Sequence, residues 1–331
     1  RDRAMLEIVA SFFRQAVIQG IPLLYGSTGE ILTEKSGNLN LGIPGIMYIG
    51  GIMGVIGAYF YENAVEVINP FLAVLIPFAC SFFGSMLMAL IYSFLTVTLR
   101  ANQNVTGLAL TTFGTGVGNF FGGSLSSLFG EGGSIALNAT GNLYKTTLPF
   151  ADDLGLFGET FLSFGFLAYL AIAIAIAAQY FLNHTRAGLS LRAVGESPAT
   201  ADAAGINVTK YKYLATCIGG GIAGLGGLYF IMDYTGGTWT NGGFGDRGWL
   251  AIALVIFALW KPKYSILGSI LFGGLYIVYL YIPGLSRSSQ EIFKMLPYVV
   301  TIVVLVVLSI RNRRENQPPE SLGLSYFREE R

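Results

Sequence analysis

Long apolar runs separated by short polar stretches fill this chain, and they restrict the folds open to it. The hydrocarbon core of a bilayer takes about 20 apolar residues per helix. Measured against that length, the 331-residue sequence predicts nine membrane spans, at 10–29, 41–61, 70–98, 102–123, 161–182, 213–232, 248–260, 264–282 and 295–310. Only helices and closed barrels satisfy their backbone groups in lipid. We therefore expect an all-α, polytopic transmembrane protein of about nine or ten spans, with residues 1–331 forming a single transmembrane domain.

Three of these segments are irregular. The run from Asn69 to Leu99 is too long for one upright helix, and 248–260 is short unless Phe244 to Arg247 enters the bilayer as a re-entrant turn. The opening segment is amphipathic, so a surface-lying first helix or a tenth crossing stays open. Arg14 interrupts the apolar stretch that a signal peptide requires, and we expect the segment to be retained.

Composition excludes several classes of protein. The chain is 53% hydrophobic and only 12% charged, which no ordinary soluble domain of this length shows. Its 20 Lys and Arg residues nearly balance 19 Asp and Glu residues, so the charge gives no reason to expect a nucleic-acid partner. Cys80 and Cys217 both lie in apolar runs, where a disulfide or a metal site is not expected.

The placement of basic residues predicts the orientation, because short cytoplasmic loops retain Lys and Arg. Basic residues gather in the loop 183–212, in a hairpin and in the tail 311–331, namely Arg186, Arg192, Lys210, Lys212, Lys261, Lys263, Arg311, Arg313 and Arg314. We expect all three sites in the cytoplasm. The loop 124–160 is expected on the extracytoplasmic side, because it carries Glu131, Asp152, Asp153 and Glu159 against a single basic residue, Lys145.

Titratable residues are absent from most predicted spans. Ion-coupled carriers usually place a carboxylate in the membrane. Here only Asp233 and Asp246 approach the bilayer, at span ends, which favours an energy source outside it. Nor does the chain contain H-E-x-x-H, C-x-x-C, G-x-S-x-G or a phosphate-binding G-x-x-x-x-G-K-[ST] loop. We expect no catalytic site, no metal and no directly bound cofactor.

Neutral polar residues interrupt the first half of the chain. Between Asn38 and Pro44, glycines, a proline and the potential N-cap Asn40 predict a helix break, which is either a capped interfacial loop or the border of a substrate path. Candidate path residues are Asn38, Asn40, Asn102, Asn104, Thr111, Thr115 and Asn119. Their neutrality favours an uncharged polar solute such as a sugar or nucleoside. Glycines four residues apart, as at Gly50 and Gly54, indicate close helix packing or a sliding surface.

Four stretches together resemble a known family. "ILTEKSGNLNLGIPGIMYIGG", "RANQNVTGLALT", "RAVGESPATADAAGINVTKYKYLA" and "GDRGWLAIALVIFALWKP" are similar to permease subunits of bacterial nucleoside ABC importers, within the ribose-type and branched-chain amino acid permease superfamily. Two departures are Pro44, where relatives usually have an acidic residue, and Ser197, where they usually have asparagine.

The resemblance implies a multi-pass protein of the bacterial cell inner membrane that moves nucleosides. Its implied partners are a cytoplasmic ABC ATPase that binds ATP and Mg²⁺, a second and different permease subunit, and an extracytoplasmic solute-binding lipoprotein. Permeases for ribose-like sugars or branched-chain amino acids are alternatives. An ATP-independent channel or an ion-coupled carrier is a further alternative, from another class.

One short segment has the signals of a capped helix. Ser197 is a good N-cap, Pro198 suits the first helical position, and Gly205 suits a left-handed exit, which predicts a helix of about two turns. Its alanines would let a partner approach closely. We expect it to be the coupling helix seated in the ATPase, although an ordinary linker is the alternative. The proposed coupling residues are Arg186, Arg192, Glu196, Ser197, Pro198, Ala201, Ala204 and Gly205.

Overall fold

The computed structural model describes residues 2–128 and 135–330, and within these ranges the chain is mostly helical. The helices are α1 (Asp2–Lys35), α2 (Ile43–Ala64), α3 (Pro70–Ser93), α4 (Gln103–Leu128), α5 (Asn138–Tyr144), α6 (Gly155–Phe161), α7 (Phe166–His184), α8 (Arg186–Glu196), α9 (Pro198–Ala203), α10 (Val208–Tyr229), α11 (Arg247–Phe257), α12 (Pro262–Ile277), α13 (Arg287–Lys294) and α14 (Leu296–Arg311). Two short strands, β1 (Ile135–Ala136) and β2 (Thr238–Trp239), pair antiparallel. The all-α fold class is confirmed.

Each of the nine predicted spans corresponds to a helix. Among the described residues, seven helices are long and apolar enough to cross a membrane, and α11 is a shorter apolar helix of 11 residues. Helix α4 has 26 residues but is not one of the seven. It is rich in Gly, Thr and Ser, which lower its hydropathy. The polytopic architecture is confirmed, and the count of nine depends on α4 and α11.

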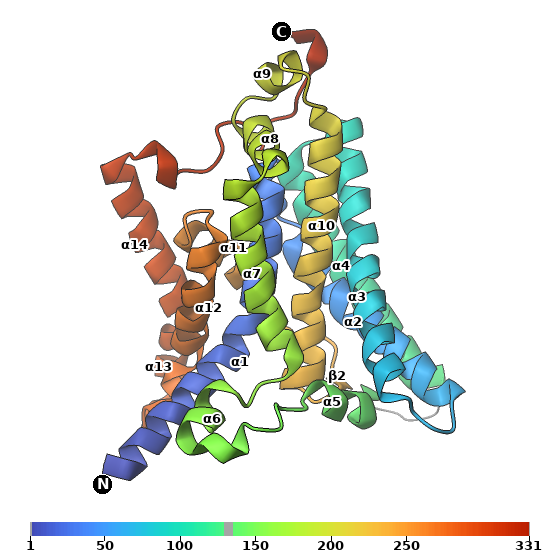
Figure 1. Ribbon diagram of the computed structural model, residues 1–331, viewed down its shortest axis with the longest axis vertical. Coiled ribbons are helices and arrows are strands. Elements are labelled where there is room, and N and C mark those ends of the chain that lie inside the picture. Colours follow the sequence, from blue (N-terminus) through green and yellow to red (C-terminus); the bar gives the residue numbers. More distant parts are fainter. Residues whose placement is uncertain (1, 129–134, 331) are drawn as a thin grey trace.

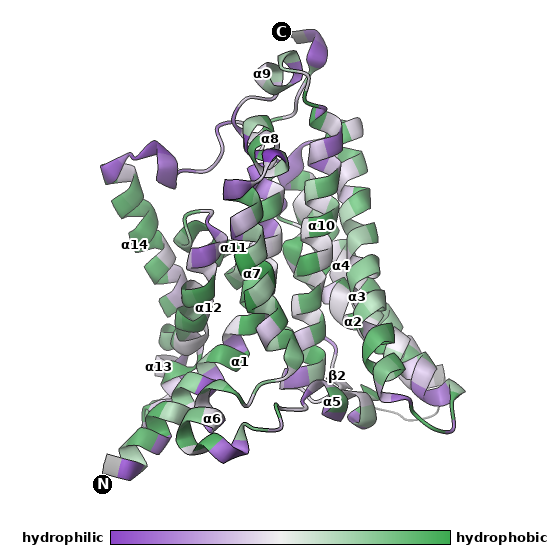
Figure 2. Cartoon of the chain, in the orientation of Figure 1, coloured by the Kyte–Doolittle hydropathy of each residue, from purple (hydrophilic) through white to green (hydrophobic). Residues whose placement is uncertain are grey.

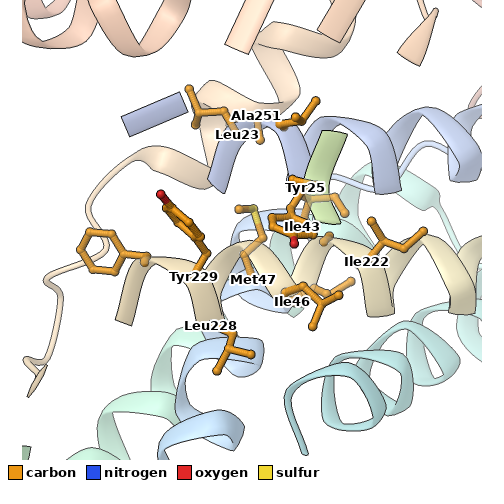
Figure 3. Packing of buried hydrophobic residues seen from close by; sticks show 14 of the residues in the cluster. Leu23, Tyr25, Ile43, Ile46, Met47, Ile222, Leu228, Tyr229 and Ala251 are labelled. Carbon is orange, nitrogen blue, oxygen red and sulfur yellow. The ribbon is translucent and has the colours of Figure 1, made fainter. Parts of the chain in front are cut away.

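Helices α1, α2 and α10 form the centre of the molecule (Figure 1). Figure 3 shows Met47 of α2 beside Tyr25 of α1 and Tyr229 of α10, and all three side chains are buried. Glycine makes this packing possible. A Cβ atom on Gly50 would lie 2.2 Å from the carbonyl oxygen of Gly224, so the backbones of α2 and α10 are in direct contact. The described structure therefore uses this pair of glycines for packing within one chain.

The molecule has two polar ends with apolar helices between them (Figures 1 and 2). Helices α8 and α9, the C-terminus and the end of α14 lie at one end, and α5, α6 and the N-terminus lie at the other (Figure 1). The three basic sites thus share one end, as expected, opposite the described part of the loop 124–160. Glu131 of that loop lies outside the described residues.

Helix α1 corrects two expectations. It runs unbroken from Asp2 to Lys35 between the two polar ends, so it is not a surface-lying helix (Figure 1). It also extends past residue 29, and its last turns hold Glu30 and Glu34, which are 0% and 3% exposed. The expectation that Asp233 and Asp246 are the only carboxylates near the bilayer is therefore wrong. Glu34 accepts a hydrogen bond from Trp260, and Glu30 Oε1 accepts one from the Asn40 amide, at 3.0 Å.

Two further irregular segments are resolved by the structure. The run from Pro70 to Thr98 is one continuous helical span of 29 residues, ending in a π-helical turn. As expected, this is longer than one upright helix needs to cross a bilayer. The turn before α11 enters the protein, because Phe244 and Arg247 are only 5% and 7% exposed. Arg247 donates to Gln19 of α1 at 3.0 Å and lies over the ring of Phe230. The short α11 thus starts inside the protein.

Candidate functional site

The segment predicted as a coupling helix forms α9. The Ser197 side chain accepts a hydrogen bond from the Thr200 amide at 3.4 Å and also contacts the Thr200 hydroxyl at 2.8 Å. Pro198 occupies the first helical position, and Gly205 has a φ of +85°, which a glycine adopts without strain. The capping signals in the sequence are confirmed. The helix itself has six residues, which is close to the two turns expected.

Burial divides the small residues of α9 into two faces. Ala201 is 3% exposed and packs with Val194 of α8 and Val208 of α10 in a small apolar cluster. The opposite face is exposed and consists of Ala199, Thr200, Ala203 and Ala204. The expectation that Ala201 contributes to the exposed surface is therefore wrong, because this side chain holds α9 against its own chain. Ala204 remains available to a partner.

The charged coupling residues lie on α8, which carries a Thr185 N-cap that accepts from the Gly188 amide at 3.0 Å. Arg186 is exposed in the first turn of this helix. Arg192 is half-buried two turns later, and Glu196 ends the helix beside α9. The structure therefore brings Glu196 next to α9, while Arg192 lies one turn earlier on α8 and Arg186 lies at the other end of that helix.

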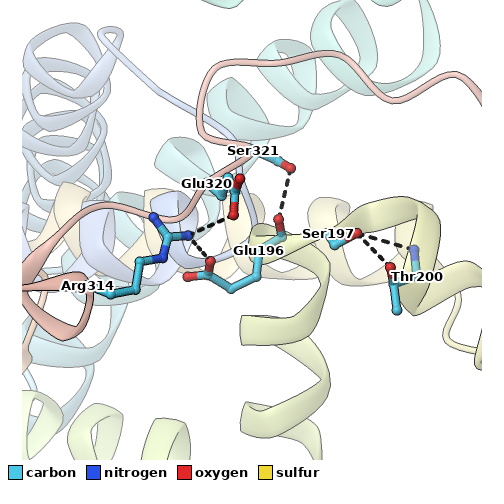
Figure 4. A network of polar contacts seen from close by, with 6 residues as sticks. All are labelled: Glu196, Ser197, Thr200, Arg314, Glu320 and Ser321. Carbon is cyan, nitrogen blue, oxygen red and sulfur yellow. Dashed lines mark hydrogen bonds and ion pairs between the residues drawn. The ribbon is translucent and has the colours of Figure 1, made fainter.

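The C-terminal tail crosses this segment, which the sequence did not indicate. We call residues 314–329 the C-terminal strap. Arg314 pairs with Glu196 and lies 3.3 Å from Glu320 (Figure 4). The Ser321 amide donates to the Gly195 carbonyl at 3.0 Å, and the Ser321 hydroxyl donates to the Glu196 carbonyl at 3.1 Å. The strap is thus bonded to the end of α8.

Further along, the strap contacts α9 and the loop between α1 and α2. The Tyr326 hydroxyl donates to Asp202 Oδ2 at 2.7 Å, and Arg328 lies 3.3 Å from the same oxygen. The Gly323 amide donates to the Gly37 carbonyl at 3.0 Å. One tail segment therefore connects α8, α9 and the α1–α2 loop. Because these contacts join residues more than 100 positions apart, no local sequence pattern could have indicated them.

The α1–α2 loop is closed by hydrogen bonds. Asn38 Nδ2 donates to Thr216 Oγ1 at 2.9 Å, and Lys212 Nζ donates to Asn38 Oδ1 at 3.4 Å. Asn40 Oδ1 accepts from the Gly42 amide at 2.9 Å, so Asn40 caps the approach to α2 while Gly42 is the N-cap residue itself. Asn38 and Asn40 are both 0% exposed. The predicted helix break is confirmed, but its polar side chains are buried rather than facing an open path, and Asn40 Nδ2 has no hydrogen-bond partner among the described residues.

The remaining candidate path residues lie on α4. Asn102 Oδ1 accepts from the Val105 amide at 3.0 Å and so caps the helix, while Asn104 is exposed in its first turn. The Thr111 hydroxyl donates to the Leu41 carbonyl at 2.8 Å, and the Thr115 hydroxyl donates within the helix. Asn119 accepts from Tyr48. Thr111, Thr115 and Asn119 are partly buried and Asn102 and Asn104 are exposed, whereas Asn38 and Asn40 are fully buried.

Helix α4 also exposes small and polar residues among large apolar ones such as Leu108, Phe113 and Phe120. Thr112 and Gly116 are exposed, and a Cβ atom on Gly116 would meet no atom within 4 Å. The Thr112 hydroxyl donates to the Leu108 carbonyl of its own helix, at 3.3 Å. This face is open to a solute or to another subunit. Among the described residues, no group of three or more His, Cys, Asp or Glu side chains is placed to hold a metal ion.

Comparison with known proteins identifies the family. Residues 13–305 match the family described as the branched-chain amino acid transport system permease component. A putative glucose ABC transporter permease of Haloferax volcanii is 32% identical, over 98% of this chain and 99% of that protein. A nucleoside ABC transporter permease of Lactococcus lactis subsp. cremoris is also 32% identical, over 88% and 90%. A guanosine ABC transporter permease of Bacillus subtilis is 29% identical, over 99% of each chain.

These similarities agree with the fold and with the resemblance seen in the sequence. The seven long apolar helices are those of a multi-pass protein of the inner membrane. In this family the permease is the membrane subunit of an ABC transporter, which uses ATP through a partner ATPase. The chain therefore belongs to the branched-chain amino acid transport system family of ABC transporter permeases.

Proposed function

We propose that this chain is the permease subunit of a bacterial ABC importer that moves nucleosides across the inner membrane. The observation that carries the proposal is the similarity, over most of the chain, to a nucleoside permease and a guanosine permease. The neutral hydroxyl and amide groups on α4 support it, because a nucleoside is polar and uncharged. A glucose permease of comparable identity favours a sugar as the second candidate.

Energy comes from a partner in this proposal. The cytoplasmic coupling loop is 183–212, and the exposed face of α9 within it inserts into an ABC ATPase that binds ATP and Mg²⁺. The tail 311–331 is also cytoplasmic, and the loop 124–160 faces the solute-binding lipoprotein. A second, different permease completes the membrane part. Because Glu30 and Glu34 are buried carboxylates of α1, an absence of carboxylates from the membrane no longer supports an ATP-driven importer. The family and the exposed face of α9 support it instead.

The substrate path is proposed along α4. The partly buried Thr111, Thr115 and Asn119 and the exposed Thr112 and Asn104 border it. Asn38 and Asn40 are not part of this path, since both side chains are fully buried inside their own chain. Asn102 marks its cytoplasmic end as the cap of α4.

Uptake by reconstituted vesicles tests the function. The vesicles contain both permeases, the ATPase and the binding protein, and purine nucleosides compete with ribose, glucose and leucine for uptake. We expect nucleosides to compete and uptake to require ATP. Competition by glucose alone would favour the second candidate, and uptake without ATP would exclude an ABC importer.

The path is tested by Thr112→Val, which removes one hydroxyl without changing the size of the side chain. Loss of a substrate hydrogen bond of about 1 kcal/mol raises the KM of uptake about fivefold. Thr301→Val is the matched control, since Thr301 is buried on α14 and bonds to the Pro297 carbonyl. An unchanged KM for Thr112→Val would remove this residue from the path.

A further inference from the structure

A second polar feature, separate from α9 and α4, lies at the same end of the molecule. A cavity of about 500 Å³ opens among the ends of α1, α7 and α8, the turn before α12 and the start of the strap. Its lining holds five basic residues, Lys35, Arg192, Lys261, Lys263 and Arg314. Two acidic residues, Glu196 and Glu315, also line it. The positive charges are therefore in excess.

The pairing of these charges increases the imbalance. Glu196 is already paired with Arg314, which also lies 3.3 Å from Glu320 (Figure 4). Lys261 donates to the amide oxygen of Asn316 at 3.1 Å, and this neutral acceptor does not compensate the lysine charge. Within the described part of the chain, the Lys35 and Arg192 side chains make neither a salt bridge nor a hydrogen bond. Cations from four separate segments thus surround one space, and its lining carboxylates are Glu196, which is already paired with Arg314, and Glu315.

Arg192 gives the independent observation. Its Nε atom is buried and has no hydrogen-bond partner among the described residues. Leaving a buried charged donor unpaired costs more than leaving a neutral one unpaired, so an acceptor is expected. The guanidinium group matches phosphate and carboxylate oxygens in geometry. An anion with several oxygens would match these donors in charge and in geometry.

We propose that this cavity binds a phosphate group at the cytoplasmic face of the membrane. Arg192 gives directional hydrogen bonds, and Lys35, Lys261 and Lys263 supply charge. Basic pockets between the cytoplasmic ends of membrane helices suit phospholipid headgroups, and the same chemistry suits a soluble phosphate ester. The site goes beyond the proposed transport function, and it does not depend on which solute is imported.

The cavity lies against the coupling segment. Arg192 and Glu196 belong to α8, and Arg314 begins the strap that continues to α9. A phosphate bound here would join α8, the turn before α12 and the C-terminal end of α1. We therefore expect an occupied site to stabilise the cytoplasmic end of the permease.

The experiment measures thermal unfolding of the purified permease in detergent. One series adds inorganic phosphate against chloride at equal ionic strength, and a second adds phosphatidylglycerol against phosphatidylcholine. Ligands that bind only the folded state raise the midpoint of unfolding. A rise with both phosphate and phosphatidylglycerol indicates a general phosphate site, and a rise with phosphatidylglycerol alone indicates a lipid site.

Variants connect the effect to the cavity. Lys263 is exposed, so Lys263→Gln should fold normally. Arg192→Lys keeps the positive charge but loses the planar set of guanidinium N–H donors. We expect each to weaken binding about tenfold. Lys210→Gln, an exposed lysine outside this cavity, should bind as the wild type does. The proposal would be overturned if neither additive raised the midpoint of unfolding. It would also be overturned if Lys210→Gln weakened binding as much as the two cavity variants do. The proposal would also fail if the ATPase alone, and neither additive, stabilised the permease through Arg192.

Discussion

Gly50 has no side chain, and this allows helices α2 and α10 to approach closely. A Cβ atom there would lie 2.2 Å from the carbonyl oxygen of Gly224 and 2.4 Å from its Cα atom. Both neighbours are backbone atoms, so they cannot rotate away as a side chain would. The sequence showed the spacing of these glycines, but it could not show which helix lies opposite.

Gly50→Ala should therefore destabilise the protein by about 1–3 kcal/mol through overpacking. Gly116→Ala is the matched control, because it lies in α4 with nothing within 4 Å of its Cβ position. There the gain in helix propensity should leave stability unchanged or raise it by up to about 1 kcal/mol. Thermal unfolding in detergent compares the two variants. Equal midpoints would show that α2 and α10 tolerate separation.

Some residues were assigned correctly from the sequence because their role is local. Ser197, Pro198 and Gly205 need only their own backbone to act as cap, first residue and exit of α9. The roles of Ala201 and Glu30 could not be found in that way. Their burial depends on α8, α10 and the α1–α2 loop, which are distant in sequence or packed by tertiary contacts.

At the scale of elements, α9 depends on its cap. A helix of six residues is not stable alone, so its order comes from Ser197 and from packing. Ser197→Ala should cost about 1 kcal/mol and speed amide hydrogen exchange in residues 198–204 about fivefold. Ser197→Asn keeps an N-cap acceptor and should exchange as the wild type does. Equal exchange in Ser197→Ala and Ser197→Asn would mean that packing alone orders α9.

The C-terminal strap is the second element whose contribution can be measured. Tyr326→Phe removes the hydrogen bond to Asp202, worth about 1–2 kcal/mol for a charged acceptor. We expect the strap to become more sensitive to protease after residue 321. Tyr281→Phe is the control, since its hydroxyl contacts Ser11 at 3.4 Å near the opposite end. Unchanged cleavage in Tyr326→Phe would show that the backbone bonds of Ser321 and Gly323 suffice.

At the scale of the whole molecule, apolar length and charge placement predicted most of the architecture. The nine segments, the shared end of the basic sites and the break after α1 all follow from lipid thickness and backbone hydrogen bonding. The strap and the cavity beside Arg192 could not be predicted from apolar length or from charge placement. Both arise where segments far apart in sequence meet, and their charges are spread over positions with no common pattern.

In the proposed function, energy enters the permease through the exposed face of α9. Ala204→Glu places a bulky charge on that face without disturbing the buried Ala201. Asn142→Glu is the control, an exposed position on α5 at the opposite end of the molecule.

The most direct measurement is ATP-driven nucleoside uptake by vesicles that contain the candidate ATPase, together with the amount of ATPase that copurifies with the permease. We predict that Ala204→Glu lowers both about tenfold at equal permease levels, as expected for a charge buried in an interface. Asn142→Glu should leave both unchanged. Full uptake and full copurification with Ala204→Glu would contradict the claim.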